Sequence, residues 1–369
     1  MITATAVYAL TEQGAELARR LAAEYGGLVC VPERMARSGE QGFRTLRDCV
    51  AESFSRFSRH IFITAAGIAV RCIAPHLRDK GSDPAVVVLD QAGKHVISLV
   101  SGHLGGANDL ARSVACSTGG TAIITTATDT AGLPSLDIVA MEAGCAIHNL
   151  AAVRHVNGAL LAEESVSVYD PADLLRLRQS THAERFRFVE TPWEALGDGP
   201  AVLVTWRDAL LFSPGEQTLV LHPPVLRLGI GCRKGRSVSA IETFVRRELG
   251  TRMIALASVA EIVSVEAKAE EPGLLAAARA LGKSIRFFPA ETLARVTVPN
   301  PSEAPQRAVG TRSVAEASAL SAAAEQGPAR LVQEKCKDSG TTLAVALSVP
   351  FLSSASLTTL ATEGRQQHL

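Results

Sequence analysis

The stretch from Ser101 to Asp109 reads SGHLGGAND and holds the densest group of residues that could do chemistry. Its glycines would let the backbone approach a ligand closely, and a helix beginning there would offer amides to an anion. His103 has an ordinary pKa near neutrality, which suits it to act as a general base. A tight turn in which Asn108 or Asp109 caps a helix is the simpler interpretation of these residues alone. In either case, we expect the turn to fold without the imidazole.

Hydroxyls and carboxylates follow the next expected strand, in the segments TTATD (125–129) and LPSLD (133–137). Ligands of open α/β sheets bind beyond the carboxyl ends of strands, where these segments should lie. Thr126 and Asp129 are therefore candidates for substrate binding or acid–base chemistry. Asp129 and Asp137 would serve equally well as turn or cap residues.

Basic residues lie in two further segments. Arg71, Arg78 and Lys80 should lie near one edge of the sheet, where they could hold the carboxylates of a polyacid. A solvated charged face explains the same residues equally well.

The second basic segment follows a strand and precedes a helix, and it reads GIGCRKG from Gly229 to Gly235. The spacing matches a dinucleotide fingerprint only weakly. Basic side chains at a helix start instead indicate an anion site, formed by Arg233, Lys234 and Arg236 and joined by Lys268, Glu271, Lys335 and Lys337.

Composition excludes several classes of protein. Lys plus Arg and Asp plus Glu both number 37, and aromatic residues make up 4% of the chain. A nucleic-acid binder generally needs a basic field and stacking surfaces, so we expect no nucleic-acid partner. The histidines are scattered without an H-E-x-x-H motif, which predicts no metal site on the protein.

The expected location is the cytoplasm. The seven cysteines form no Cys-x-x-Cys pair and do not suggest a disulfide framework. No apolar run reaches about 18 residues, and no basic stretch precedes an apolar run at the N-terminus. We therefore expect neither a membrane partner nor a signal peptide.

The elements that must position these residues alternate between short buried strands and helices, which predicts an α/β fold. We expect two α/β domains with mainly parallel or mixed sheets, at 1–140 and 226–349, joined by a smaller α+β middle domain at 141–225. A strand pair is expected in the middle domain at 201–206 and 218–221, and a strand at 254–259 in the C-terminal domain. Residues 350–369 should form a flexible tail.

Two long segments carry a family resemblance. GIAVRCIAPHLRDKGSDPAVVVLDQAGKHVISLVSGHLGGANDLAR and TTATDTAGLPSLD resemble the N-terminal part of the CbiG family, the cobalt-precorrin-5A hydrolases. LGIGCRKG, SVEAKAEEPGLLAAARALG, RFFPAETL and VGTRSVAEASAL resemble, in order, the CobE-like domain at the end of that family.

The resemblance implies a hydrolase of anaerobic cobalamin (vitamin B12) synthesis. Its substrate would be a cobalt-bearing tetrapyrrole with a δ-lactone that ties a ring-A acetate to C20. Water would open the lactone, and C20 would leave with its methyl group as acetaldehyde, which gives cobalt-precorrin-5B. No cofactor is then expected, because the cobalt is carried by the substrate.

This chemistry needs a base, donors for an oxyanion, and cations for many carboxylates. His103 is the expected base, with Asp109 and Asp129 as further catalytic candidates, and the amides around Gly105 and Gly106 are the expected oxyanion donors. The expected substrate-binding residues are Arg71, Lys80, Ser101, Gly105, Gly106, Asn108, Thr126, Arg233, Lys234 and Lys268.

Two other functions stay open at this point. One is a non-catalytic tetrapyrrole carrier or pathway accessory, because the CobE-like half is also found as a separate protein. The other is a nucleotide-binding enzyme that uses Gly229–Gly235. A homo-oligomer, and transient contact with neighbouring pathway enzymes, stay open as partners.

Overall fold

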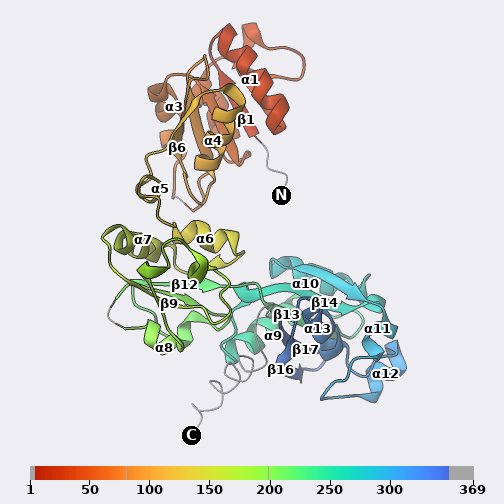
Figure 1. The fold of residues 1–369 in the computed structure, drawn as a ribbon. Helices are drawn as coiled ribbons and strands as arrows, with labels where there is room; N and C mark the ends of the chain where they lie inside the picture. The colour runs from red at the N-terminus through yellow and green to blue at the C-terminus, as the bar shows by residue number, and fades with distance from the viewer. Residues whose placement is uncertain (1–4, 80, 198, 349–369) are drawn as a thin grey trace. The chain divides into compact units, whose positions relative to one another are not determined.

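The computed structural model describes residues 5–79, 81–197 and 199–348. The chain divides into two compact units, Met1–Ile138 and Val139–Leu369. Three mixed, largely parallel sheets with helices between the strands confirm the α/β class (Figure 1). The expected tail at 350–369 and Lys80 lie outside the described residues. Within the described part of the chain, no helix combines the length and apolarity needed to cross a membrane.

The N-terminal unit is built on a seven-stranded sheet with the strand order β3-β2-β1-β4-β5-β6-β7. Neighbouring strands are parallel except β5 and β6, which form an antiparallel pair. The strands are β1 (Thr5–Ala9), β2 (Gly27–Pro32), β3 (Gln41–Phe43), β4 (Arg59–Ile63), β5 (Ala85–Leu89), β6 (His95–Val100) and β7 (Thr121–Ile123).

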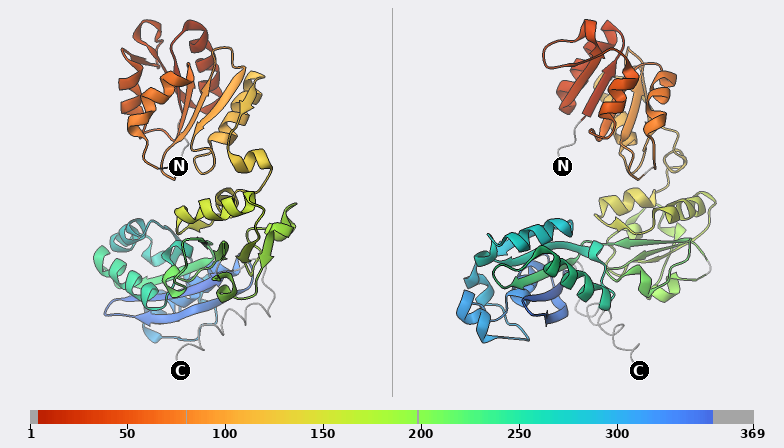
Figure 2. Two further views of the ribbon diagram at one scale, coloured as in Figure 1. Left: turned by 90° about the vertical axis from the view of Figure 1, so that its left-hand side faces the viewer. Right: turned by 180° about the vertical axis from the view of Figure 1, so that it is seen from behind.

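Both faces of this sheet are covered (Figure 2). Successive side chains of a strand point to opposite faces, so Val7 and Ala9 pack in one core and Ala6 and Tyr8 in another. One core includes side chains of α1 and α4, and the other includes side chains of α2 and α3. The helices of the unit are α1 (Glu12–Tyr25), α2 (Leu46–Ser53), α3 (Ala66–Ile73), α4 (Ala107–Thr118), α5 (Ala127–Ala131) and α6 (Leu136–Glu142), the last of which runs into the second unit.

The β5–β6 pair decides where the chemistry-bearing loops lie. Val86 of β5 lies opposite Val100 of β6, so the loop before β5 and the loop after β6 meet at one edge of the sheet. β7 is parallel to β6, and its carboxyl end therefore reaches the same edge. Three described segments converge there: residues 81–84, 101–106 and 124–129.

The second unit begins with a five-stranded sheet in the order β10-β9-β11-β12-β8. Only the β12–β8 pair is antiparallel. The expected strand pair is thus part of a larger and largely parallel sheet. Its elements are β8 (Ala146–Ile147), α7 (Val153–Leu161), β9 (Val166–Tyr169), β10 (Phe186–Phe188), α8 (Pro192–Ala195), β11 (Ala201–Val204) and β12 (Thr218–His222).

The unit ends with a second five-stranded sheet in the order β15-β14-β13-β17-β16. β13, β14 and β15 are parallel, whereas β17 runs antiparallel to both of its neighbours. Its elements are β13 (Leu226–Cys232), α9 (Val238–Thr251), β14 (Val259–Val265), α10 (Pro272–Ala280), β15 (Ser284–Phe288), α11 (Ala290–Ala294), α12 (Glu303–Val309), α13 (Val314–Ala324), β16 (Ala329–Lys337) and β17 (Thr341–Ser348).

The prediction of a strand at 254–259 is wrong in its position, because the observed strand β14 begins only at Val259. Ile254 makes only an isolated bridge to Arg207, and Leu256–Ser258 form a 3₁₀ turn before β14 begins. Ile254 and Ala255 are buried and Leu256 is partly buried against the same core, which explains why this apolar segment resembled a strand. Single 3₁₀ turns also occur at Glu33–Met35, Ala74–His76, Leu150–Ala152, Leu177–Gln179, Ala183–Arg185, Ala209–Leu211 and Glu266–Lys268.

Candidate functional site

The loop between β6 and α4 carries His103. Ser101 adopts a left-handed backbone conformation with φ of 58°, which is uncommon for a residue with a side chain. Gly106 is the N-cap of α4, with φ of 79° and no side-chain cap bond. Neither Asn108 nor Asp109 therefore caps the helix, and the simpler cap interpretation is wrong.

The glycines of the loop are needed because its backbone folds tightly on itself. A Cβ on Gly105 would lie 2.3 Å from the Ser101 Cβ, and one on Gly102 would lie 2.7 Å from the Asn108 Oδ1. The Gly106 amide donates to the His103 carbonyl oxygen at 2.8 Å, so it is used within the turn. The Gly105 amide has no partner among the described residues, and it remains the candidate oxyanion donor.

The His103 imidazole lies between two carboxylates. Its Nε2 is 3.0 Å from Asp129 Oδ2, and its Nδ1 is 3.3 Å from Asp137 Oδ2. Two hydroxyls lie beside the ring: Ser135 Oγ is 3.0 Å from Nδ1, and Thr128 Oγ1 is 3.3 Å from Nε2. The imidazole thus ties the turn to α5, to α6 and to the loop before α6.

These carboxylates favour the protonated ring. The hydrogen bond to Asp137 is the largest influence and raises the pKa of His103 above its ordinary value, and Asp129 adds to it. Desolvation of the ring opposes them by lowering the pKa, because burial disfavours the charged form. Since the side chain is only 13% exposed, little water screens the pairs. Imidazolium therefore persists to a higher pH here than in an exposed histidine.

Asp129 is held in place from α4. Its Oδ2 accepts a hydrogen bond from Asn108 Nδ2 at 2.9 Å, and its Oδ1 accepts one from Arg112 at 2.5 Å. Asn108 also donates to Thr126 Oγ1 at 3.1 Å. The predicted residues Asn108, Thr126 and Asp129 thus lie in one network with His103. In that network Asn108 contacts the carboxylate directly, and Thr126 contacts Asn108.

Other predicted residues of the unit contact neither His103 nor Asp129 directly. Asp109 is exposed and pairs with Arg112 at 2.9 Å. Arg71 is exposed and donates to the carbonyl oxygen of its own helix neighbour Gly67. Ser101 Oγ donates to the Asp83 carbonyl oxygen, which ties the 81–84 loop to the histidine loop. Lys80 lies outside the described residues.

Two members of the network were not predicted to act with His103. Ser135 and Asp137 reach the ring from α6 and the loop before it, and Ser135 donates to Asp137 Oδ1 at 2.5 Å. The sequence places them more than thirty residues after His103, with no motif that joins the two segments. The close Ser-x-Asp spacing after a strand was the only signal, and it is equally typical of a turn.

In the second unit, Arg233, Lys234 and Lys268 line one pocket of about 1090 Å³. The pocket lies at the carboxyl ends of the parallel strands β13 and β14, where ligands of α/β sheets usually bind.

The glycines of the GIGCRKG segment have a packing explanation. A Cβ on Gly229 would lie 1.9 Å from the Ala315 carbonyl oxygen of α13, and one on Gly231 would lie 2.6 Å from Thr342 Oγ1. The amides of Arg233 and Gly235 are also used, because they donate to the Gly340 carbonyl oxygen and to Glu271 Oε1. Two amides that could have formed a phosphate cradle are thus already engaged, which argues against a dinucleotide site.

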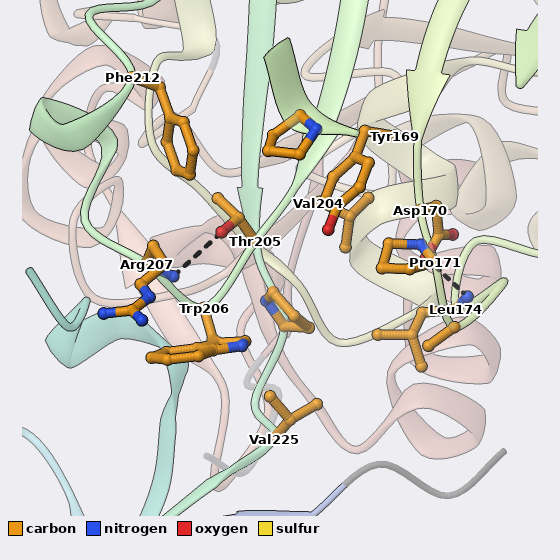
Figure 3. Close-up of a pocket in the computed structure, with 13 residues that line it drawn as sticks. Tyr169, Asp170, Pro171, Leu174, Val204, Thr205, Trp206, Arg207, Phe212 and Val225 are labelled. Atoms are coloured by element: carbon orange, nitrogen blue, oxygen red, sulfur yellow. Dashed lines mark hydrogen bonds between the residues drawn. The ribbon is translucent and has the colours of Figure 1, made fainter. Parts of the chain in front are cut away.

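A second cavity of the same unit lies where β9 and β11 end, and Figure 3 shows its lining. Tyr169, Trp206 and Phe212 wall it, and Asp170 is fixed there by the amides of Leu174 and Leu175. Its volume is about 50 Å³, which is room for a few water molecules at most. This cavity is too small for a macrocycle.

No group of three or more His, Cys, Asp or Glu side chains is arranged to hold a metal ion in the described part of the chain.

Family models match the chain in three consecutive regions. They are described as "Cobalamin synthesis G N-terminal" at residues 48–129, "Cobalamin biosynthesis central region" at 134–223 and "Cobalamin synthesis G C-terminus" at 226–346.

Curated relatives cover most of the chain. A protein of Priestia megaterium named cobalt-precorrin-5A hydrolase is 30% identical over 360 residues, which are 94% of this chain and 95% of that protein. One of the same name from Salmonella typhimurium is 34% identical over 293 residues, which are 78% and 82% of the two chains. Protein CobE of a Sinorhizobium species is 32% identical over 123 residues, or 33% of this chain and 79% of that protein.

Proposed function

Because the chain belongs to the CbiG family of cobalamin-synthesis proteins, we propose that it is itself a cobalt-precorrin-5A hydrolase. In the proposed reaction, water attacks the acyl carbon of the δ-lactone and frees the ring-A acetate. C20 then leaves with its methyl group as acetaldehyde, and cobalt-precorrin-5B remains. The cobalt belongs to the substrate.

The observation that carries the proposal is the imidazole between two carboxylates. His103 is the one histidine in the network of β6, α4, α5 and α6 described above, and both of its nitrogens contact a carboxylate. Asp129 and Asp137 orient the ring and stabilise its charged form, as a carboxylate does for a catalytic histidine generally. A positioned proton carrier is what lactone hydrolysis requires.

The roles follow from the protonation states. For neutral His103 to act as the base, the attacking water takes the place of the carboxylate at one ring nitrogen, while the other nitrogen keeps its carboxylate contact. The ring then accepts a proton from that water, and imidazolium returns it as the reaction proceeds. The Gly105 amide is the proposed donor to the oxyanion formed at the acyl carbon. Because the pKa of His103 is raised, the neutral ring forms only above the ordinary pKa of histidine, so the rate should rise with pH through an inflection above that value.

A matched pair of variants tests this function. His103→Gln removes the titratable ring but keeps a polar side chain, whereas His95→Gln removes a histidine of the same unit that is 67% exposed. Acetaldehyde released from cobalt-precorrin-5A in a single turnover should fall by roughly 10²–10⁴-fold in the first variant and stay at the wild-type rate in the second. Equal rates in all three proteins would refute the role of His103.

A carrier function is the second candidate, and the basic pocket of the second unit favours it. A carrier would retain the macrocycle through purification and release no acetaldehyde. The same assay therefore separates the two functions.

A further inference from the structure

The pocket at the carboxyl ends of β13 and β14 has a strongly one-sided charge. Five basic side chains line it, and they come from the ends of β13 and β14 and from β16: Arg233, Lys234, Lys268, Lys335 and Lys337. The acidic side chain in the lining is Asp338, and Arg236 neutralises it through a contact of 2.7 Å. Like charges gathered in one concave site raise its positive potential, which favours a polyanionic ligand.

Three of these cations are available to a ligand. Arg233, Lys234 and Lys337 are exposed, and no ion pair or side-chain hydrogen bond joins them to another described residue. Lys268 lies 3.5 Å from Glu271, and Lys335 donates to the Asn300 carbonyl oxygen. The two engaged lysines brace the pocket, and the three available cations are spread over different strand ends.

Buried acids fix the walls that carry these cations. Glu271 accepts the Gly235 amide at 2.6 Å and contacts Lys268, so it holds the turn that carries Arg233 and Lys234. Glu316, which is fully buried, accepts the Lys335 amide at 3.0 Å and the Asn300 side-chain amide at 2.8 Å. The pocket is therefore preorganised, and this reduces the entropy lost when a ligand binds.

The remaining wall is largely apolar. It comes from the segment 299–314, which contains α12 and contributes Pro299, Pro301, Ala304, Pro305, Ala308 and Val309. A pocket with an apolar wall and separated cations suits a flat apolar ring with acidic groups around its rim. A single phosphate would need a cradle of amides, whereas the amides of Arg233 and Gly235 are engaged elsewhere.

We propose that this pocket binds a tetrapyrrole macrocycle through its carboxylate side chains, with Arg233, Lys234 and Lys337 as the anchoring cations. Its volume of about 1090 Å³ is at the upper end of the usual range for small-molecule sites, as a large macrocycle requires. The identity of the natural ligand rests on the proposed function, whereas the charge and shape of the pocket do not.

The test uses the full chain and a free-base porphyrin with eight carboxylate side chains as the probe. Porphyrin fluorescence measures its affinity for the wild type, for the double variant Arg233→Gln/Lys234→Gln and for Lys337→Gln. The control is Arg154→Gln/Arg246→Gln, which removes two exposed charges that do not line the pocket.

We expect the affinity to fall at least about tenfold in the double variant and severalfold in Lys337→Gln, with no change in the control. Added salt should weaken binding by the wild type more than by the double variant, because fewer charge pairs remain to be screened. Affinity equal to the wild type in both pocket variants would overturn the proposal, as would an equal loss in the control.

The two proposals fail in different ways. If the wild type released no acetaldehyde while the pocket variants lost porphyrin affinity, the hydrolase would be refuted and the pocket supported. Normal acetaldehyde release together with unchanged porphyrin affinity in the pocket variants would refute the pocket alone.

Discussion

The imidazole of His103 contacts carboxylates from two different helices, Asp129 of α5 and Asp137 of α6. A histidine in such a position is stabilised as imidazolium, and its neutral form appears only at higher pH. This differs from an exposed histidine in a glycine-rich turn, which is what the sequence alone suggests. The carboxylate contacts therefore change the expected pH dependence of any proton transfer at this residue.

Asp137→Asn should lower the pKa of His103, because the Asp137 contact is the largest influence that raises it. Asp129→Asn should lower it by less. The titration of the ring proton by NMR measures both shifts without a substrate, and His103→Gln identifies the signal. An unchanged His103 titration in Asp137→Asn would contradict the contact.

His103→Ala should destabilise the N-terminal unit, because it removes the imidazole that contacts Asp137, whose side chain is only 5% exposed. Breaking a buried pair costs about 3–5 kcal/mol, and we expect the lower end because Ser135 still donates to Asp137. Since the folded-state pKa is raised, the contribution of the pair is full below the ordinary pKa of histidine and is lost as pH rises through the raised value.

Chemical unfolding at pH 6 and pH 9 measures this dependence, with His95→Ala as the exposed control. The cost of His103→Ala should be larger at pH 6. A cost independent of pH would show that packing of the ring, and not its charge, stabilises the turn.

At the scale of elements, the turn between β6 and α4 depends on close backbone approach. Gly105→Ala would place a Cβ 2.3 Å from the Ser101 Cβ and 2.9 Å from its carbonyl oxygen, so the turn would have to open. The midpoint temperature of thermal unfolding should fall by several degrees, and the rate of acetaldehyde release should fall with it.

Gly158→Ala is the matched control, because a Cβ there meets nothing within 4 Å on the exposed face of α7. It should leave stability unchanged or slightly raised, since alanine favours a helix. If Gly105→Ala were tolerated as well as Gly158→Ala, the turn would not need the close approach seen here.

Long, regular elements were predictable from the sequence. The continuous apolar run at 85–90 predicts β5, and the helical spacing of apolar residues at 12–24, 238–249 and 314–325 predicts α1, α9 and α13. All four lie within a few residues of their observed bounds. Short strands such as β3, β8 and β10 were missed, because two or three residues carry no usable period. Pairing in the sheet, and not local sequence, defines them.

The same limit applies to the site. His103 and Asp129 were predictable because both follow strands, but the contact of His103 with Ser135 and Asp137 depends on how α6 packs. The antiparallel β5–β6 pair brings the 81–84 loop to the histidine loop, and no local pattern specifies that direction. The sequence predicts where strands end, but only the three-dimensional fold shows which of these ends lie close together.

At the scale of the whole molecule, balanced charge conceals a local imbalance. The chain carries 37 basic and 37 acidic residues, yet five basic side chains line the pocket of the C-terminal sheet. The network around His103 lies in the N-terminal unit, and the three family regions cover residues from both units. Binding and chemistry can therefore be tested separately, by variants in different parts of the chain.

Turnover of cobalt-precorrin-5A in ¹⁸O-labelled water shows whether water attacks the lactone carbonyl. Attack by water at the acyl carbon should leave one labelled oxygen in the ring-A acetate of the product, with one acetaldehyde released for each macrocycle. Mass spectrometry of the macrocycle and an assay of acetaldehyde measure both quantities. A macrocycle recovered unchanged, or a product with an unlabelled acetate, would contradict hydrolysis at the lactone carbonyl.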